Sequence, residues 1–367
     1  TFSAPTNWDN QLLDHYESLS IREVFGSLAS APIGSGRSKI TLPQVDKVKA
    51  KQHIEYAHTK NIAFNFLVNA SCMGNMKYKR TSHERIIKQL SWIDSTGIDS
   101  VTVTIPYLAR IIKKQFPRLR IKTSVIAQVN SVPRALAWQN LGVDEINIDY
   151  MCNRDFKMLR AIRKAVSVDL CLLANDQCLF QCPYRQYHYN SIAHTTQKGN
   201  ELKGNYLDYC FVSCIIDKYT RPQELIRSRW IRPEDLDRYE QMGFSRFKLS
   251  GRVMTAKWLK RMSSAYVQRF YHGNLADILA VASFNANGSV HYHIDNDALD
   301  KFLDHFISLD CSAECNSCDW CKSIAEQVIT FDKKKAKQLI RNCRSLLEGL
   351  TSSTLLNYFD ESDNRES

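Results

Sequence analysis

The sequence predicts an α/β protein in which a TIM-like (β/α)8 barrel precedes a small cysteine-rich C-terminal appendage. Short apolar segments alternate with amphipathic segments between residues 20 and 282, and such alternation pairs strands in parallel through right-handed crossovers. About eight strand candidates in roughly 260 residues match the size of this barrel. The chain also contains twelve cysteines, most of them in two groups. An open doubly wound sheet is the alternative fold.

The elements follow one another in a regular order. Residues 1–20 read as an opening amphipathic helix, and a glycine-bracketed loop at 32–37 follows the first strand. The expected strands are 22–28, 63–71, 100–105, 120–127, 145–150, 168–175, 245–251 and 276–282. The expected helices between them are 42–61, 82–95, 107–115, 132–140, 155–165, 233–242 and 255–269. No GxGxxG motif follows the first strand, which argues against dinucleotide binding.

The periodicity changes near residue 283, and we place the domain boundary there. Residues 1–282 form the expected barrel, including a cysteine-bearing loop at 178–214. Residues 283–367 form a C-terminal region that contains a CxxxCxxCxxC motif and a terminal helix. Within this region we expect a small strand at 287–297 and a helix at 297–309.

The composition of the chain limits the classes of function that it can have. The chain is 44% hydrophobic and 24% charged, as expected for an ordinary globular protein. It has no apolar run of membrane-spanning length and no visible signal peptide, so we expect a cytoplasmic protein without a membrane partner. The net charge of +11 permits binding to nucleic acid or to an anionic small molecule. HExxH, GxSxG and P-loop motifs are absent from the sequence, which argues against the common hydrolases and NTPases.

The first cysteine group consists of two Cys-x3-Cys pairs after the sixth expected strand. These cysteines are Cys178, Cys182, Cys210 and Cys214. Soft thiolate ligands at short spacing suit an iron–sulfur cluster or zinc, and buried free cysteines or disulfides are the alternative. Polar aromatic residues beside the group favour a cluster near a substrate site over a structural zinc. Among these residues Tyr184, Tyr187 and His188 are candidate proton donors.

The second cysteine group lies in the C-terminal region. It contains Cys311, Cys315, Cys318 and Cys321, and its compact spacing is a strong metal-binding signal. The group could hold a second cluster or lend one ligand to the first. One 4Fe-4S cluster, or two, is therefore the cofactor that the sequence predicts.

Several stretches together resemble a known family: the early strand that ends in a glycine loop, the cysteine loop after the sixth strand, and residues 230–252. Residues 230–252, WIRPEDLDRYEQMGFSRFKLSGR, resemble the signature of the collagenase-like peptidase family, peptidase family U32, at Phe247, Lys248, Gly251 and Arg252. The resemblance implies an iron–sulfur TIM barrel related to oxygen-independent hydroxylases of quinone precursors or RNA bases, with prephenate as a reported oxygen donor. It also implies that the first cysteine group supplies the cluster ligands. The cysteine spacing and the CxxxCxxCxxC motif depart from the common family pattern, which points to a divergent member.

The main functional hypothesis is an iron–sulfur redox enzyme, most simply an oxygen-independent hydroxylase of a small organic or peptide metabolite. Arg37 and Arg252 would pair with carboxylate or phosphate groups of the substrate. An electron donor or another partner protein would complete the reaction. An RNA-modifying hydroxylase, a peptidase and a zinc-stabilised scaffold are the alternatives. No nucleophile–base pair is recognisable in the sequence, and no single basic, aromatic stripe marks an RNA surface.

Overall fold

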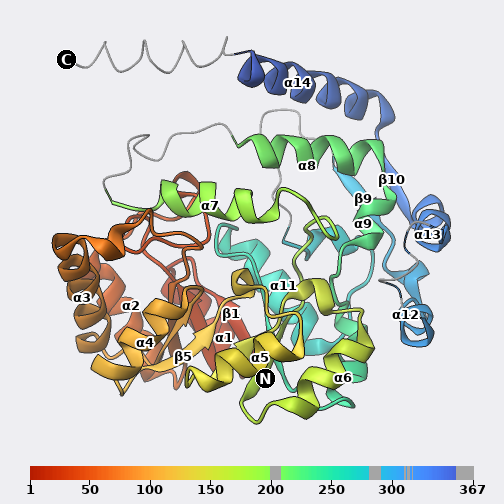
Figure 1. Cartoon of the computed structure of the whole chain (residues 1–367). Coiled ribbons are helices and arrows are strands. Elements are labelled where there is room, and N and C mark those ends of the chain that lie inside the picture. The colour runs from red at the N-terminus through yellow and green to blue at the C-terminus, as the bar shows by residue number, and fades with distance from the viewer. Residues whose placement is uncertain (199–207, 281–290, 310, 312–314, 316, 353–367) are drawn as a thin grey trace.

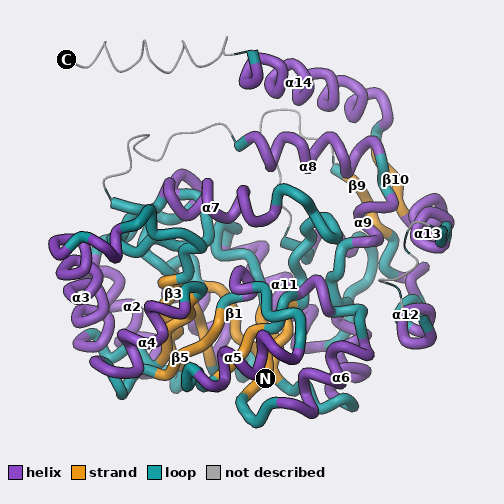
Figure 2. Tube along the Cα trace, viewed as in Figure 1, coloured by secondary structure: helices purple, strands orange, loops and turns teal. Residues whose placement is uncertain are grey.

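Eight parallel strands close into a barrel with helices around its outside (Figures 1 and 2). The structure is a computed structural model, and it describes residues 1–198, 208–280, 291–309, 311, 315 and 317–352. The strands follow one another around the barrel in chain order. The barrel closes where β1 (Phe2–Pro5) pairs with β8 (Arg246–Lys248), with Ser3 opposite Lys248. The predicted TIM-like barrel is confirmed.

The remaining elements of the barrel have these bounds. Between β1 and β8 the strands are β2 (Glu23–Gly26), β3 (Ala63–Val68), β4 (Ser100–Val103), β5 (Arg120–Thr123), β6 (Glu145–Asn147) and β7 (Asp169–Leu173). The longer outer helices are α1 (Asn10–Ser18), α2 (Lys47–Thr59), α3 (Arg80–Ser95), α4 (Pro106–Gln115), α5 (Val132–Asn140), α6 (Phe156–Ala165) and α11 (Ala256–Gln268). The short helix α10 (Leu236–Glu240) precedes β8.

Helix α6 illustrates why these segments fold as they do. Phe156, Leu159 and Ile162 recur every third residue and are all buried, so one face of the helix packs on the barrel. Asp155 caps the helix by accepting a hydrogen bond from the backbone N–H of Met158 at 2.8 Å. The apolar period and the capping residue together fix the position of the helix.

Both ends of the expected strand series need correction. The opening segment, expected as one helix, begins with β1 and becomes helical only at Asn10. The strand expected at 276–282 is absent from the described residues, where Leu275–Asp277 forms a 3-10 turn and Ala280 makes one isolated bridge to Asp176. Residues 281 and 282 lie outside the described part. The free edge of β8 is already taken by β1, so the described part of this apolar run, up to Ala280, adds no strand to the barrel.

The segment between β7 and β8 is largely helical instead of the expected loop. It contains α7 (Arg185–Thr195), α8 (Tyr209–Thr220) and α9 (Gln223–Arg227). Figure 1 shows α7 lying across one end of the barrel. Cys210 and Cys214 are one turn apart on α8, whereas Cys178 and Cys182 precede α7.

The C-terminal region packs against this helical segment. Its elements are β9 (Tyr292–Ile294), α12 (Asp304–Ser308), α13 (Trp320–Val328), β10 (Ile329–Phe331) and α14 (Lys333–Thr351). Helix α14 lies beside α8, where Cys343 packs against Val212 and Ile215 (Figure 1). The strand expected at 287–297 is confirmed over Tyr292–Ile294. Residues 287–290 lie outside the described part, and the predicted end at 297 is wrong, because Asp297–Leu299 forms a 3-10 helix. No described helix is both long enough and apolar enough to cross a bilayer.

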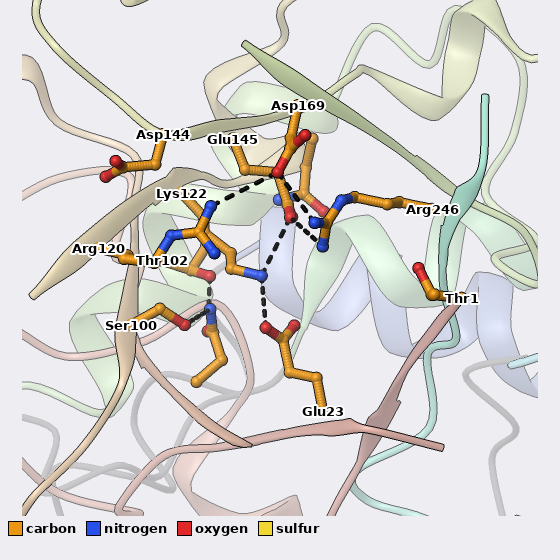
Figure 3. A network of polar contacts seen from close by, with 12 residues as sticks. Thr1, Glu23, Ser100, Thr102, Arg120, Lys122, Asp144, Glu145, Asp169 and Arg246 are labelled. Carbon is orange, nitrogen blue, oxygen red and sulfur yellow. Dashed lines mark hydrogen bonds and ion pairs between the residues drawn. The ribbon is translucent and has the colours of Figure 1, made fainter. Parts of the chain in front are cut away.

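Charged side chains occupy part of the barrel interior (Figure 3). Lys122 on β5 forms ion pairs with Glu23 on β2 and, at 3.1 Å, with Glu145 on β6. Burial alone would lower the pKa of Lys122, but the two carboxylates outweigh burial and raise it. Arg246 on β8 extends the network through its 3.0 Å contact with Asp169. The Lys122–Glu23 pair joins β5 to β2, and Arg246 also lies 3.5 Å from Glu145, which joins β8 to β6, so these two contacts link strands that are not neighbours.

We expect Lys122→Met to lower the free energy of unfolding by about 3–5 kcal/mol, because it leaves two carboxylates without their cation inside the protein. Lys51→Met is the matched control, since Lys51 and its partner Glu55 are both more than half exposed, and it should cost no more than about 0.5 kcal/mol. Urea unfolding followed by circular dichroism checks both variants. Equal stability of the two variants would show that the interior ion pairs do not hold the barrel together.

Candidate functional site

A cavity lies at the carboxyl ends of the barrel strands, where TIM barrels carry their active sites. It holds about 60 Å³ of space that water could occupy, and it is partly open to solvent. Phe25, Leu67, Leu173 and Lys248, at or near the ends of β2, β3, β7 and β8, line it. Polar groups reach it from the loops that follow the strands and from α7. Its mixed polar and apolar lining suits a small organic or anionic group.

Two arginines give the cavity a cationic wall. Arg252 is only 5% exposed and donates a hydrogen bond to Ser27 Oγ at 2.7 Å. Burial, together with the nearby charge of Arg37, lowers its pKa, and no described carboxylate pairs with it. Arg37 donates to Ser250 Oγ at 3.0 Å and lies 3.6 Å from Asp176. Asp176 is the one carboxylate among the described lining residues, so an anion would be attracted to this wall.

Gly251 allows the chain to bring Arg252 to the cavity. Its φ of +137° lies in a region that residues with side chains rarely adopt. A Cβ atom at this position would also lie 2.5 Å from Cζ3 of Trp258. The structure thus unites the two predicted anion-binding arginines, although they are 215 positions apart in the chain.

The tyrosine pair Tyr150 and Tyr189 lines the cavity and was missed by the sequence analysis. Their hydroxyl groups are 3.0 Å apart and buried. Burial raises the pKa of both groups, so they stay protonated and can donate hydrogen bonds. Arg185 approaches Tyr189 Oη at 3.4 Å and is itself fixed by two hydrogen bonds to Asp149, at 2.8 and 2.6 Å. The contact between Arg185 and Tyr189 could have been predicted from the sequence, because residues four positions apart lie on the same face of a helix.

The three predicted proton donors do not line this cavity. Tyr187 is 59% exposed. The Nε2 atom of His188 lies 2.8 Å from a carboxylate oxygen of Asp208. Tyr184 packs edge-on against Tyr209, with ring centroids 5.8 Å apart. Their catalytic role stays a prediction, while Tyr150 and Tyr189 are the tyrosines among the described residues that line the cavity.

The first cysteine group lies against the cavity wall. Cys178 packs on the small cluster formed by Tyr150, Met151 and Leu173, and burial raises its pKa to about 12. The nearby charge of Cys214 adds to the raised pKa values of Cys178, Cys182 and Cys210, after the larger effect of burial.

The second cysteine group faces arginines. Both terminal nitrogens of Arg229 donate to Cys311 Sγ at 3.6 Å, and Arg227 donates to the backbone oxygen of Cys315 at 3.5 Å. Burial raises the pKa of Cys321, at the start of α13, to about 11. Part of the connecting chain, residues 312–314 and 316, lies outside the described residues.

All twelve cysteines lie among the described residues, and all are free thiols. No group of three or more histidine, cysteine, aspartate or glutamate side chains in the described part is arranged to hold a metal ion. A single tetrahedral zinc would hold its thiolates within about 4 Å of one another. In a four-iron cluster each thiolate binds a different iron atom, so the four thiolates lie farther apart than those around a single zinc ion. The eight cysteine ligands named from the sequence stay a prediction.

Comparisons with known proteins agree with the resemblance in the sequence. The model of peptidase family U32 matches residues 42–274. An uncharacterized protease of Methanocaldococcus jannaschii is 33% identical over 297 residues, which cover 81% of this chain and 86% of the relative. The solved structure of the U32 peptidase Mk0906 is similar in fold, with a TM-score of 0.50 and 18% identity, over 68% of this chain and 91% of that one. The chain belongs to peptidase family U32.

Proposed function

We propose that this protein is an iron–sulfur-dependent oxidoreductase, most simply an oxygen-independent hydroxylase, of an anionic small organic or peptide metabolite. The position of Cys178 carries the proposal. Cys178 contacts the cluster that includes Tyr150 and Leu173, and both of these residues line the cavity. An electron carrier held by this cysteine would lie one side chain away from a bound substrate.

Cys178, Cys182, Cys210 and Cys214 would hold a 4Fe-4S cluster. All four are free thiols, and burial raises the pKa of Cys178, Cys182 and Cys210. Burial disfavours free thiolates, and iron would compensate for that cost by binding them. When bound, such a cluster supplies or accepts single electrons. The second group, with Arg229 beside Cys311, is the candidate for a further cluster, because arginine would balance the negative charge of four thiolates.

The protein's own side chains would bind and orient the substrate. Arg252 and Arg37 attract its carboxylate or phosphate group, and the burial of Arg252 strengthens that attraction by excluding water. The hydroxyl pair of Tyr150 and Tyr189 supplies a proton donor inside the cavity. An external electron donor or partner protein would complete the cycle.

Peptidase activity, which the names of the relatives suggest, is the second candidate. The cavity contains Ser124 and Ser250, but its described lining includes no histidine or cysteine. Ser250 accepts a hydrogen bond from Arg37, and Ser124 accepts one from Asn69 at 3.2 Å, so neither hydroxyl is paired with a general base. These contacts favour the redox proposal. RNA modification stays a prediction.

Anaerobically purified protein should contain iron and acid-labile sulfide and absorb visible light. Cys178→Ala should bleach this absorption and abolish activity, because the cluster would lose its ligand next to the cavity. Cys72→Ser, outside both cysteine groups, is the matched control and should keep its colour. About four irons per chain would support one cluster, and about eight would assign a second to the C-terminal group. Zinc in place of iron, or a fully coloured Cys178→Ala protein, would contradict the proposed set of ligands.

Arg252→Ala should raise the Kd of succinate, used as a carboxylate probe in calorimetry, by about ten- to a hundredfold, because a charged hydrogen bond contributes about 1.5–3 kcal/mol. The KM of the substrate should rise similarly while the visible spectrum stays unchanged. Arg252→Lys, which keeps the charge, should lose less affinity. Arg80→Ala, at a side chain that is 93% exposed, is the control. Unchanged succinate binding in Arg252→Ala would make Arg252 a structural residue.

A further inference from the structure

Lys248 is a second reactive-site candidate in the cavity, independent of the cysteines. It is the last residue of β8 and one of the residues that line the cavity. Its Nζ lies 4.1 Å from the centroid of the Phe25 ring. No described residue accepts a hydrogen bond from this nitrogen or forms an ion pair with it. Phe25 lines the cavity too, so the lysine and the ring beside its amine belong to the same wall.

The surrounding charges explain why this lysine has no carboxylate partner. Glu23 on β2 and Glu145 on β6 lie near enough to affect it, but both pair with Lys122. Burial lowers the pKa of Lys248 to about 8, with a further lowering by Lys122, while Cys171, Glu23 and Glu145 oppose these effects. An ordinary lysine has a pKa of about 10.4, so at neutral pH the neutral fraction of Lys248 is roughly two hundred times larger.

The same cavity can orient an anionic ligand toward this amine. Arg37 and Arg252 lie on its wall together with apolar Leu67 and Leu173. A neutral amine in a desolvated site beside other cations is the arrangement that activates lysine as a nucleophile toward carbonyl groups. The arginines would bind the carboxylate or phosphate of a ligand whose carbonyl carbon then meets Nζ.

We propose that Lys248 forms a protonated imine with the aldehyde or ketone group of an anionic carbonyl compound bound in this cavity. The neutral amine forms a C–N bond to the carbonyl carbon, and the carbonyl oxygen takes up a proton. Loss of this oxygen as water, with a second proton that the amine releases, leaves the iminium group. No electrons are transferred, so the step needs no oxidant or reductant. The proposal rests on the anion-binding part of the proposed function and does not depend on a cluster.

Reductive trapping tests the proposal on the full chain. The protein is incubated with glyoxylate and cyanoborohydride at pH 7, and modified lysines are located by peptide mass spectrometry. Lys248 should be modified at least tenfold faster than the exposed Lys49 and the ion-paired Lys122. Its rate should rise with pH around the pKa of about 8. Modification of Lys49 as fast as that of Lys248 would overturn the proposal.

Two variants test separately whether the Lys248 amine and an anionic ligand are required. Lys248→Met should remove the modified peptide and leave the labelling of Lys49 unchanged. Arg252→Lys should slow trapping of glyoxylate at Lys248 at least fivefold but not trapping of glycolaldehyde, a neutral aldehyde. Equal effects on both aldehydes would overturn the requirement for an anion. Selective trapping in protein that contains zinc and no iron would contradict the redox function and uphold this inference, whereas coloured protein without selective trapping would do the reverse.

Discussion

The ion pairs of Lys122 with Glu23 and Glu145 are the constraint on which the rest of this barrel depends. They place opposite charges on β2, β5 and β6 and so join strands across the interior. Two positions further along β2, Phe25 already faces the cavity, and Ser124 does so just beyond β5. The charged layer therefore lies directly behind the cavity. Because Lys122 pairs with both carboxylates, neither is left to pair with Lys248. The ion pairs that stabilise the barrel therefore also account for the unpaired amine on which the proposed imine chemistry rests.

Seven of the eight strands could be predicted from the sequence, because their apolar runs follow helical segments in a regular order. The eighth could not. β1 consists of Phe2, Ser3, Ala4 and Pro5 and lacks the β-branched residues that mark strands. The described part of the run at 276–282 includes Ile278 and Leu279, which are at most 1% exposed, so burial in the core accounts for their apolar character. The spacing of apolar residues in the sequence indicates which segments are buried. It does not show which buried segment closes the barrel, and that is decided by the pairing of β1 with β8.

The candidate site could be predicted in part for a similar reason. Barrel topology brings together the residues that follow different strands, so the sequence sufficed to place Arg37 and Arg252 at one end. The proton donors were harder to assign, because the segment around Tyr184 was expected to be a loop. In helix α7, Arg185 and Tyr189 lie on the face that contacts Asp149 and Tyr150. Tyr187 and His188 therefore lie on other faces of the helix. Neighbours in sequence then have different environments.

The two chemistries proposed for the cavity have separate physical origins. Cys178 approaches through Tyr150, from the segment between β7 and α7, whereas Lys248 projects from β8 and its acidity is set by burial and by the ion pairs of Lys122. A change in either group need not alter the other, because Lys248 lines the cavity itself, whereas Cys178 lies behind Tyr150 and Leu173. The anion-binding arginines are what they share, since a ligand held by Arg252 would be within reach of the amine and beside the cysteine wall. A negatively charged carbonyl compound would bind both arginines through its anionic group and meet Lys248 with its carbonyl carbon. A neutral carbonyl compound would engage only the amine.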